Sequence, residues 1–369
     1  MISVFGAKVS EKERSYLEVA LSNNWLGYGA LCQNFEHRCG TELGLDKFLM
    51  VNSGTSALYL AVKALNLPPG SEVILPSFTY IGCATAVIAC QLIPVFADVD
   101  SKTQNITADL IAEKISINTK AIIVVHYAGL PAEMDKILQL NIPVIEDAAH
   151  AIGAMYKGRR CGTYGQIGIY SFDGTKNIAA GEAGGLVFNN TNEYSFVKSQ
   201  RLCGVTATGF DQAQAGASAW WEEKMTSPSL RFMPSDITGA IALGQLDALT
   251  QNQEKRKYLW NIYQKELKQF EDLTTPSEAQ QGDVHGYFTY FVQSAGGHRD
   301  ALVRHLLNND VYTTLRYQPL HYTLAEYAHG ALSATELLAK QGFNLPLHPS
   351  ITDTDMDKII SLISDFYKK

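Results

Sequence analysis

Short apolar runs alternate with amphipathic stretches along the chain from about residue 50 to about residue 190. The apolar runs predict strands at Glu72–Leu75, Pro94–Ala97, Ala121–His126, Pro143–Glu146, Ile167–Phe172 and Leu186–Asn189. The amphipathic stretches between them predict helices at Ser56–Leu65, Tyr80–Ala89 and Asp109–Ile115. Strands that alternate with helices form a mostly parallel sheet covered on both faces, so the pattern predicts an α/β fold.

The pattern changes after about residue 235, where Ser235–Phe270 predicts long helices and a smaller α+β portion follows. We therefore expect a large domain over residues 1–245 and a small C-terminal α+β domain over residues 246–369. Ser10 and Glu13 predict a capping box that opens a helix near the N-terminus, and this helix and the loop after it could pack on the small domain. Gly204–Ser229 predicts a long ordered loop.

The composition of the chain limits the kinds of molecule that it is expected to bind. The 369 residues include 37 acidic and 30 basic side chains, a formal net charge of −7, which argues against nucleic acid as the main partner. No apolar stretch is long enough to span a bilayer, and Met1–Ser10 does not resemble a signal peptide. None of the six cysteines forms a CxxC motif, so we expect reduced thiols in a cytoplasmic protein, with no metal centre and no membrane partner.

Candidate chemistry follows several of the predicted strands. Asn52–Ala57 leads small and hydroxyl residues into a helix, which suits a phosphate, although a plain helix cap has the same pattern. Lys176 lies in a small-residue turn after a strand, where desolvation would lower its pKa as a Schiff-base lysine needs, although a surface lysine is the simpler interpretation. Tyr80 follows another strand and could stack on a flat ring or belong to the core.

A pair of carboxylates lies at the end of a further strand. Glu146 and Asp147 end the run Val144–Asp147, at the edge of the sheet where ligands of open α/β folds bind. One carboxylate there could keep a heterocyclic nitrogen protonated. Glu146, Asp147 and His150 could instead bind a metal, or Asp147 could cap the next helix.

The order of these features along the chain is what binding pyridoxal phosphate requires. Asp147 would pair with the pyridine nitrogen and Lys176 would hold the aldehyde, while Thr55, Ser56 and Ser171 would hold the phosphate. The sequence also resembles the sugar aminotransferases of the DegT/DnrJ/EryC1/StrS group, within fold type I of the pyridoxal-phosphate enzymes. The resemblance covers nearly the whole chain.

The resemblance rests on several segments, which are Asn52–Leu58, Pro94–Asp100, Glu146–His150, Ser171–Gly185, Pro234–Leu246, Pro319–His321 and Leu345–Pro349. It implies that Lys176 forms the Schiff base and that Asp147 faces the pyridine nitrogen. Further cofactor contacts that it implies are Gly54, Thr55, Ser56 and Ser171 at the phosphate, Tyr80 on the ring and His150 near the ring hydroxyl. The substrate-side residues that it implies are Gly27, Tyr28, Tyr317 and His321.

One stretch departs from the pattern of the family. Many relatives place an Asn of the neighbouring subunit on the phosphate, and the aligned residue here is Arg231. Arg231 or Ser229 could cross to the partner's site in a homodimer with shared active sites, or Arg231 could pair with a carboxylate of its own subunit.

The function implied by the resemblance is transfer of an amino group from glutamate to a nucleotide-linked keto sugar, with pyridoxamine phosphate as the intermediate form of the cofactor. A 4-keto-6-deoxyhexose is the expected acceptor, and the product would enter a surface polysaccharide such as O-antigen or a natural-product glycan. The alternatives are a 3-keto sugar aminotransferase and a sugar dehydratase of the same scaffold, in which a His replaces the lysine. A nicotinamide oxidoreductase is disfavoured because no GxGxxG motif follows a strand, and a serine hydrolase because GxSxG is absent.

Overall fold

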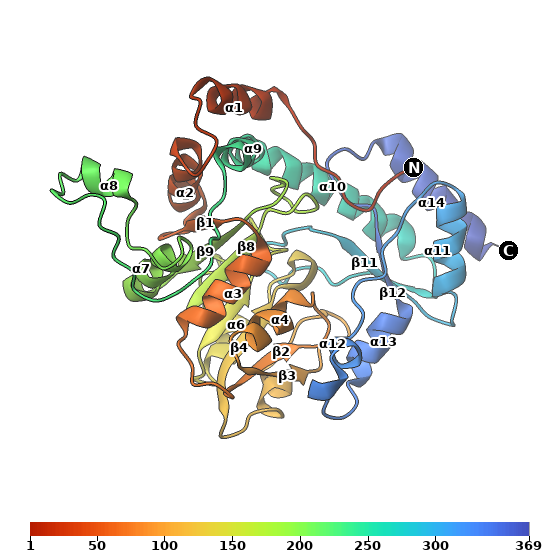
Figure 1. The fold of residues 1–369 in the computed structure, drawn as a ribbon. Helices are drawn as coiled ribbons and strands as arrows, with labels where there is room; N and C mark the ends of the chain where they lie inside the picture. Colours follow the sequence, from red (N-terminus) through yellow and green to blue (C-terminus); the bar gives the residue numbers. More distant parts are fainter. Residues whose placement is uncertain (369) are drawn as a thin grey trace.

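A seven-stranded sheet forms the centre of the larger part of the molecule, in a computed structural model that describes residues 1–368 (Figure 1). Its strands, in spatial order, are β1 (Leu49–Val51), β9 (Gly184–Phe188), β8 (Ile167–Ser171), β5 (Val144–Asp147), β4 (Thr119–Val125), β2 (Glu72–Pro76) and β3 (Ile93–Ala97). Only β9 runs antiparallel to its neighbours. The mostly parallel sheet is confirmed, and each predicted strand is present with ends moved by a residue or two.

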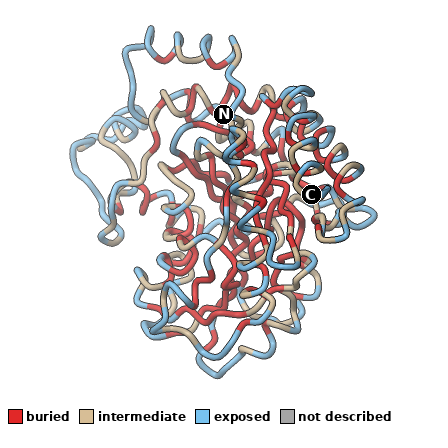
Figure 2. Tube along the Cα trace, turned by 90° about the vertical axis from the view of Figure 1, so that its right-hand side faces the viewer, coloured by how far each residue is buried: buried red, intermediate tan, exposed pale blue. Residues whose placement is uncertain are grey.

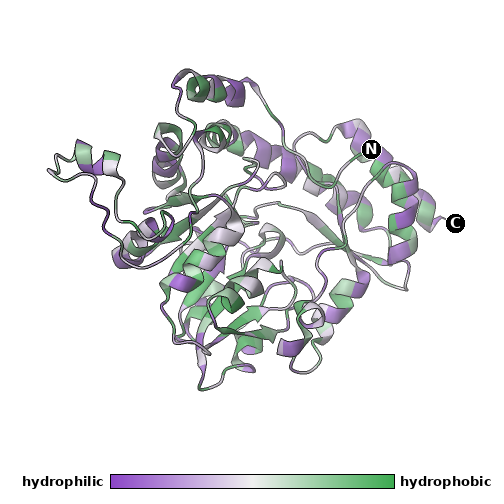
Figure 3. Cartoon of the chain, in the orientation of Figure 1, coloured by the Kyte–Doolittle hydropathy of each residue, from purple (hydrophilic) through white to green (hydrophobic). Residues whose placement is uncertain are grey.

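Both faces of this sheet are buried. Along β2, Val73 and Leu75 pack into one apolar cluster with Leu58, whereas Ile74 packs into another with Phe35 on the opposite face. The buried residues form a continuous inner layer in Figure 2, and the apolar strands lie inside more polar helices in Figure 3. The helices of this part are α1 (Glu11–Ser22), α2 (Ala30–Leu43), α3 (Gly54–Ala64), α4 (Gly82–Ala89), α5 (Ala108–Ala112), α6 (Met134–Leu138), α7 (Thr191–Gln200) and α9 (Asp236–Asp247). A small hairpin of β6 (Met155–Tyr156) and β7 (Arg159–Arg160) and the 3₁₀ turn Tyr127–Gly129 complete it.

The C-terminal part is built on a three-stranded antiparallel sheet. Its elements are α10 (Leu249–Leu267), β10 (Leu273–Thr274), β11 (Tyr290–Ser294), α11 (Arg299–Asn308), α12 (Leu320–Thr323), the 3₁₀ turn Ala325–Tyr327, α13 (Ser333–Gln341), β12 (Gly342–Leu345) and α14 (Asp353–Tyr367). The first residues of the chain run along this part, because the Ile2 N–H donates to the Asp310 carbonyl at 2.7 Å and Val4 accepts from the Leu347 N–H at 3.2 Å. The capping box of Ser10 and Glu13 at α1 is confirmed.

Polar contacts join the two parts near the strand ends. Asp98, just after β3, accepts hydrogen bonds from the backbone N–H groups of Ala334 and Thr335 and so caps α13. Ser77, just after β2, lies 2.7 Å from Nδ1 of His321 and accepts from the His321 N–H at 3.2 Å. These contacts hold the segment before α13 against the edge of the large sheet.

The predicted loop Gly204–Ser229 belongs to an arm, residues 202–232, that projects from the body of the molecule (Figure 1). The arm contains a helix that the loop prediction missed, α8 (Gly209–Gln214), and its two ends pair at Leu202 with Arg231. Several large apolar side chains of the arm are exposed, namely Phe210, Trp220, Trp221, Met225 and Leu230. Among residues 1–368, no helix combines the length and apolar character needed to cross a bilayer.

Candidate active site

The carboxyl ends of β2, β5 and β8 and the start of α3 converge at one edge of the large sheet. Asp147 is the last residue of β5 and Ser171 the last of β8, and β5 and β8 are parallel neighbours. Lys176 lies in the turn that follows Ser171, and its backbone N–H donates to the Asp173 carbonyl at 2.9 Å. The strand ends therefore bring an amine and a carboxylate to one place.

Lys176 and Asp147 interact electrostatically. Burial lowers the pKa of Lys176 to about 8, and the negative charge of Asp147 is the strongest influence opposing this shift. The ammonium lies 4.6 Å from the centre of the Phe288 ring. Burial raises the pKa of Asp147, against hydrogen bonds from the Ala149 N–H at 3.0 Å and the Cys83 thiol at 3.2 Å. A lysine that is partly unprotonated near neutral pH is suited to nucleophilic attack on a carbonyl group.

The first turn of α3 forms a cradle beside Ser171. Ser53 caps the helix by accepting from the Ser56 N–H at 3.0 Å, and Thr55 is exposed at its start. A Cβ added at Gly54 would lie 2.8 Å from Cβ of Ser171, so glycine permits this close approach. The helix N-terminus and the hydroxyls of this cradle suit a phosphate group.

Tyr80 lies beside this cradle with its side chain about half exposed, so it is not a core residue. A Cβ at Gly82 would lie 2.7 Å from the Tyr80 ring and 3.5 Å from Oγ1 of Thr55. Cys83, the next residue, contacts Asp147. The accessible ring is therefore available to stack on a flat ligand between the cradle and Asp147.

His150 has a buried ring nitrogen with no partner. Its ring stacks on Phe288 with centroids 4.1 Å apart, and its Nε2 lies 3.3 Å from the Tyr317 hydroxyl. Nδ1 is buried and makes no hydrogen bond among residues 1–368. Burial lowers the pKa of His150, so the ring stays neutral. An orphaned nitrogen of this kind calls for a ligand group, such as the ring hydroxyl of pyridoxal phosphate.

These residues fit pyridoxal phosphate. Lys176 could hold the aldehyde, Asp147 the pyridine nitrogen, the α3 cradle the phosphate and His150 the ring hydroxyl. The metal alternative is not supported, because no group of residues among 1–368 has the arrangement of a metal site. Glu146 accepts hydrogen bonds from Nε2 of His126 at 2.9 Å and from the Gly162 N–H at 2.8 Å, so it anchors a loop.

Tyr28 and Gly27, which are predicted to bind substrate, make their hydrogen bonds away from the lysine site. The Tyr28 hydroxyl contacts Glu36 at 2.7 Å and Arg201 at 3.0 Å, and the Gly27 carbonyl accepts from the Asp236 N–H at 2.8 Å. No hydrogen bond within the described chain joins either residue to the lysine site.

Two other residues predicted to bind the substrate or the partner's phosphate are His321 and Arg231. Both ring nitrogens of His321 have protein partners, Ser77 and Glu336. Arg231 is exposed at the base of the arm, next to Phe232, whose carbonyl accepts from the Asn52 N–H at 2.9 Å. The proposed substrate and partner roles of these residues remain predictions.

Sequence reasoning missed three residues of this site. Phe288 packs against both Lys176 and His150, Cys83 donates to Asp147, and Arg316 acts on Lys176 through its charge. Phe288 carries no local signal, whereas Arg316 directly precedes the predicted Tyr317 and could have been considered with it.

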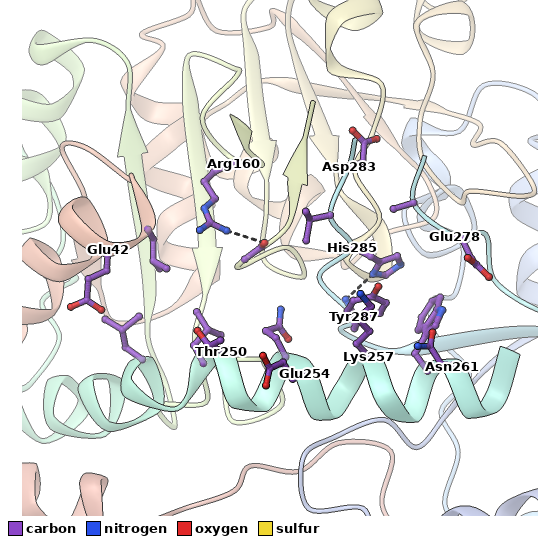
Figure 4. Close-up of a pocket in the computed structure, with 18 residues that line it drawn as sticks. Glu42, Arg160, Thr250, Glu254, Lys257, Asn261, Glu278, Asp283, His285 and Tyr287 are labelled. Carbon is purple, nitrogen blue, oxygen red and sulfur yellow. Dashed lines mark hydrogen bonds between the residues drawn. The ribbon is translucent and has the colours of Figure 1, made fainter. Parts of the chain in front are cut away.

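A separate cavity lies elsewhere in the molecule. It has a volume of about 610 Å³ and lies along α10, with Arg160, Lys257 and His285 among its lining residues (Figure 4). Neither Lys176 nor Asp147 lines it, so it is separate from the site described above.

Comparisons with known proteins agree with this chemistry. The sequence model of the DegT/DnrJ/EryC1/StrS aminotransferase family matches residues 7–364. The chain is 31% identical to a dTDP-4-dehydro-2,3,6-trideoxy-D-glucose 4-aminotransferase of Saccharopolyspora spinosa, covering 100% of this chain and 96% of the relative. It is also 31% identical to the GDP-perosamine synthase of Caulobacter vibrioides, covering 98% and 97%.

The fold has close counterparts among solved structures. The aminotransferase TlmJ of Streptoalloteichus hindustanus superposes with a TM-score of 0.93 at 33% identity, over 100% of this chain and 99% of that one. A putative sugar aminotransferase of Streptococcus pneumoniae in its PMP form has a TM-score of 0.92 at 23% identity, over 100% and 99%, and shows the shared fold. The chain belongs to the DegT/DnrJ/EryC1/StrS aminotransferase family and is a pyridoxal-phosphate-dependent sugar aminotransferase.

Proposed function

We propose that this enzyme transfers the amino group of glutamate to a nucleotide-linked 4-keto-6-deoxyhexose, giving an amino sugar for a surface polysaccharide or a natural-product glycan. The observation that carries the proposal is Lys176, which is buried, has a lowered pKa and lies close enough to the buried Asp147 for their charges to interact. The choice of a 4-keto sugar is supported by relatives named for a 4-aminotransferase and a perosamine synthase. A further relative, 30% identical, is named for spore coat polysaccharide biosynthesis. Six unpaired cysteines are compatible with a cytoplasmic location.

Each residue of the site has a physical role in this reaction. Bound pyridoxal phosphate would supply an electron-poor ring that stabilises negative charge on the carbon that carries nitrogen. Asp147 would keep the ring nitrogen of that cofactor protonated, because a carboxylate raises the pKa of a neighbouring base. Nζ of Lys176 would act as the base that takes the proton from the α-carbon of the amino donor and as the acid that gives the proton back. The same groups act in reverse when the keto sugar accepts nitrogen.

Replacing the lysine tests the proposal. Lys176→Ala should keep the cofactor bound through the α3 cradle and Asp147 but should turn over negligibly. Lys120→Ala, on the exposed end of β4, is the matched control and should keep normal turnover. A Lys176→Ala enzyme with near-normal turnover would contradict the proposal.

A panel of nucleotide-linked keto sugars with glutamate, resolved by product NMR, tests the substrate. Amination at C-4 is expected. Amination only at C-3 would favour the 3-keto alternative, and deoxygenation without amination would favour the dehydratase.

The proposal includes a homodimer with shared sites. The arm exposes Phe210, Trp220 and Trp221, an apolar surface of the kind that proteins usually cover. We propose that a second copy of the chain covers it and that Arg231 or Ser229 reaches the phosphate in the partner's site.

Mixed dimers test this arrangement. A hybrid of one Lys176→Ala subunit and one Arg231→Ala subunit contains one intact site if Arg231 acts across the interface, because that site takes its lysine and its arginine from different subunits. Activity should therefore reappear when the two inactive or impaired proteins are mixed and refolded. If Arg231 acts within its own subunit, no site in the hybrid is intact and activity should not recover.

A further inference from the structure

Arg316 is a cation of the active site without an acidic partner. Some arginines pair with carboxylates, such as Arg201 with Glu36 and Arg38 with Asp247, but no carboxylate among residues 1–368 pairs with Arg316. Arg316 is half-buried. A half-buried guanidinium without a counter-ion is costly unless an anion binds to it.

Arg316 is connected to Lys176 through two aromatic rings. Its guanidinium lies 4.9 Å from the centre of the Phe5 ring, which stacks on Phe288 at 5.3 Å. Phe288 in turn lies under the ammonium of Lys176 at 4.6 Å. After burial, the charge of Arg316 further lowers the pKa of Lys176 and of His150. The cation is therefore close enough to act on the lysine that exchanges with the substrate amine.

Three anionic groups enter this site under the proposed function, namely the α- and γ-carboxylates of glutamate and the diphosphate of the sugar nucleotide. The α-carboxylate is bonded to the reacting carbon, whereas the diphosphate is separated from the keto carbon by part of a hexose ring. The charge of Arg316 acts on His150 and on Lys176, which under the proposed function acts at the reacting carbon. Arg316 is therefore better placed to bind the α-carboxylate than the diphosphate.

We propose that Arg316 binds the α-carboxylate of the amino donor and that the Phe5 ring positions its guanidinium. The planar guanidinium can form two parallel hydrogen bonds to a carboxylate. Phe5 comes from the N-terminal segment that is hydrogen-bonded along the small sheet, so this segment forms part of the donor site. The inference rests on the proposed transfer from an amino acid.

γ-Aminobutyrate provides a matched ligand, because it is glutamate without the α-carboxylate. In Arg316→Gln, the glutamate concentration that half-saturates the donor half-reaction should rise by roughly tenfold to a hundredfold, as loss of hydrogen bonds to a charged group predicts. Competition by γ-aminobutyrate should not change. Arg304→Gln, an exposed arginine of α11, is the control and should leave both values unchanged.

A binding measurement complements the kinetics. 2-Methylglutamate has no α-hydrogen to lose, so its binding can be followed by absorbance without turnover. It should bind more weakly to Arg316→Gln by the same factor, while affinity of the apo protein for pyridoxal phosphate stays within about twofold. Phe5→Leu should weaken binding of 2-methylglutamate less than Arg316→Gln does. Phe5→Tyr should bind it as the native enzyme does, since a tyrosine ring also attracts a cation.

The outcomes separate the alternatives. If Arg316→Gln still prefers glutamate over γ-aminobutyrate as the native enzyme does, the inference is wrong. It is also wrong if the variant loses affinity for the sugar nucleotide in the acceptor half-reaction and keeps its affinity for glutamate. If Arg316→Gln does not fold, Arg316→Lys and Phe5→Leu must show the loss of glutamate preference. A native enzyme that does not react with any amino acid would instead contradict the proposed function.

Discussion

The lowered pKa of Lys176 predicts an unusual reactivity for this amine. The pKa falls from an ordinary 10.5 to about 8 because the side chain is desolvated. At pH 7 roughly one lysine in ten would then be unprotonated, about 300 times the fraction expected for an exposed lysine. The apo protein should therefore react with pyridoxal phosphate at neutral pH, and the rate should rise with pH and level off above about 8.

Asp147→Asn is the perturbation that tests this explanation. The carboxylate of Asp147 favours the charged ammonium, so its removal should lower the pKa of Lys176 further and move the midpoint of the rate profile to lower pH. The other titratable groups that influence Lys176 or Asp147 are Asp173, Arg316, Cys83 and His126, and all remain in the variant.

The assay is stopped-flow absorbance of the apo protein mixed with a saturating amount of pyridoxal phosphate, from about pH 6 to about pH 10. Asp46→Asn, an exposed carboxylate after α2, is the matched control and should leave the profile unchanged. A native midpoint near 10, or a midpoint that rises in Asp147→Asn, would refute the reasoning.

Three further substitutions test the structural supports of the site. Gly54→Ala would place a methyl group 2.8 Å from Ser171, so affinity for pyridoxal phosphate should fall by roughly tenfold, as measured by titration of the apo protein. Glu146→Gln leaves buried donors poorly paired and should lower the free energy of unfolding in urea by about 3 kcal/mol. Asp98→Ala removes the cap of α13 and should lower the same free energy by about 1 kcal/mol.

Each of these three predictions can be contradicted by a specific result. Gly40→Ala adds a methyl group on α2 that would meet only a backbone oxygen at 3.8 Å, so it should keep native affinity for the cofactor. Equal affinity in Gly54→Ala would show that the phosphate does not bind at the start of α3. Unchanged unfolding in Glu146→Gln or Asp98→Ala would show that these carboxylates contribute little to the native state.

The parallel sheet and the pair Lys176 and Asp147 could be predicted because the signal is local. Apolar runs mark β5 and β8, and the chemically important residues follow those runs directly in the sequence. β1 was missed because three residues are too few to show a periodicity. The helix α8 was missed because its Ala- and Gly-rich surroundings carry no apolar pattern.

The remainder of the site depends on contacts between distant segments. Phe5, Phe288 and Arg316 meet although more than half of the chain separates the first from the other two, because the N-terminal segment is hydrogen-bonded along the C-terminal part. Both ring nitrogens of His321 contact residues of the chain itself, Ser77 and Glu336, and the substrate contact that the resemblance implies for it stays a prediction.

The contacts of Asp98 with α13 and of Ser77 with His321 have a practical consequence. They tie the segment before α13 to the ends of β2 and β3, in the same sheet whose other strands carry the predicted cofactor residues, so substrates should find a binding surface that is already assembled. We expect crystals of the enzyme to tolerate soaking with glutamate and sugar nucleotides without cracking, and we expect calorimetry to show a heat-capacity change no larger than the ligand surface itself requires.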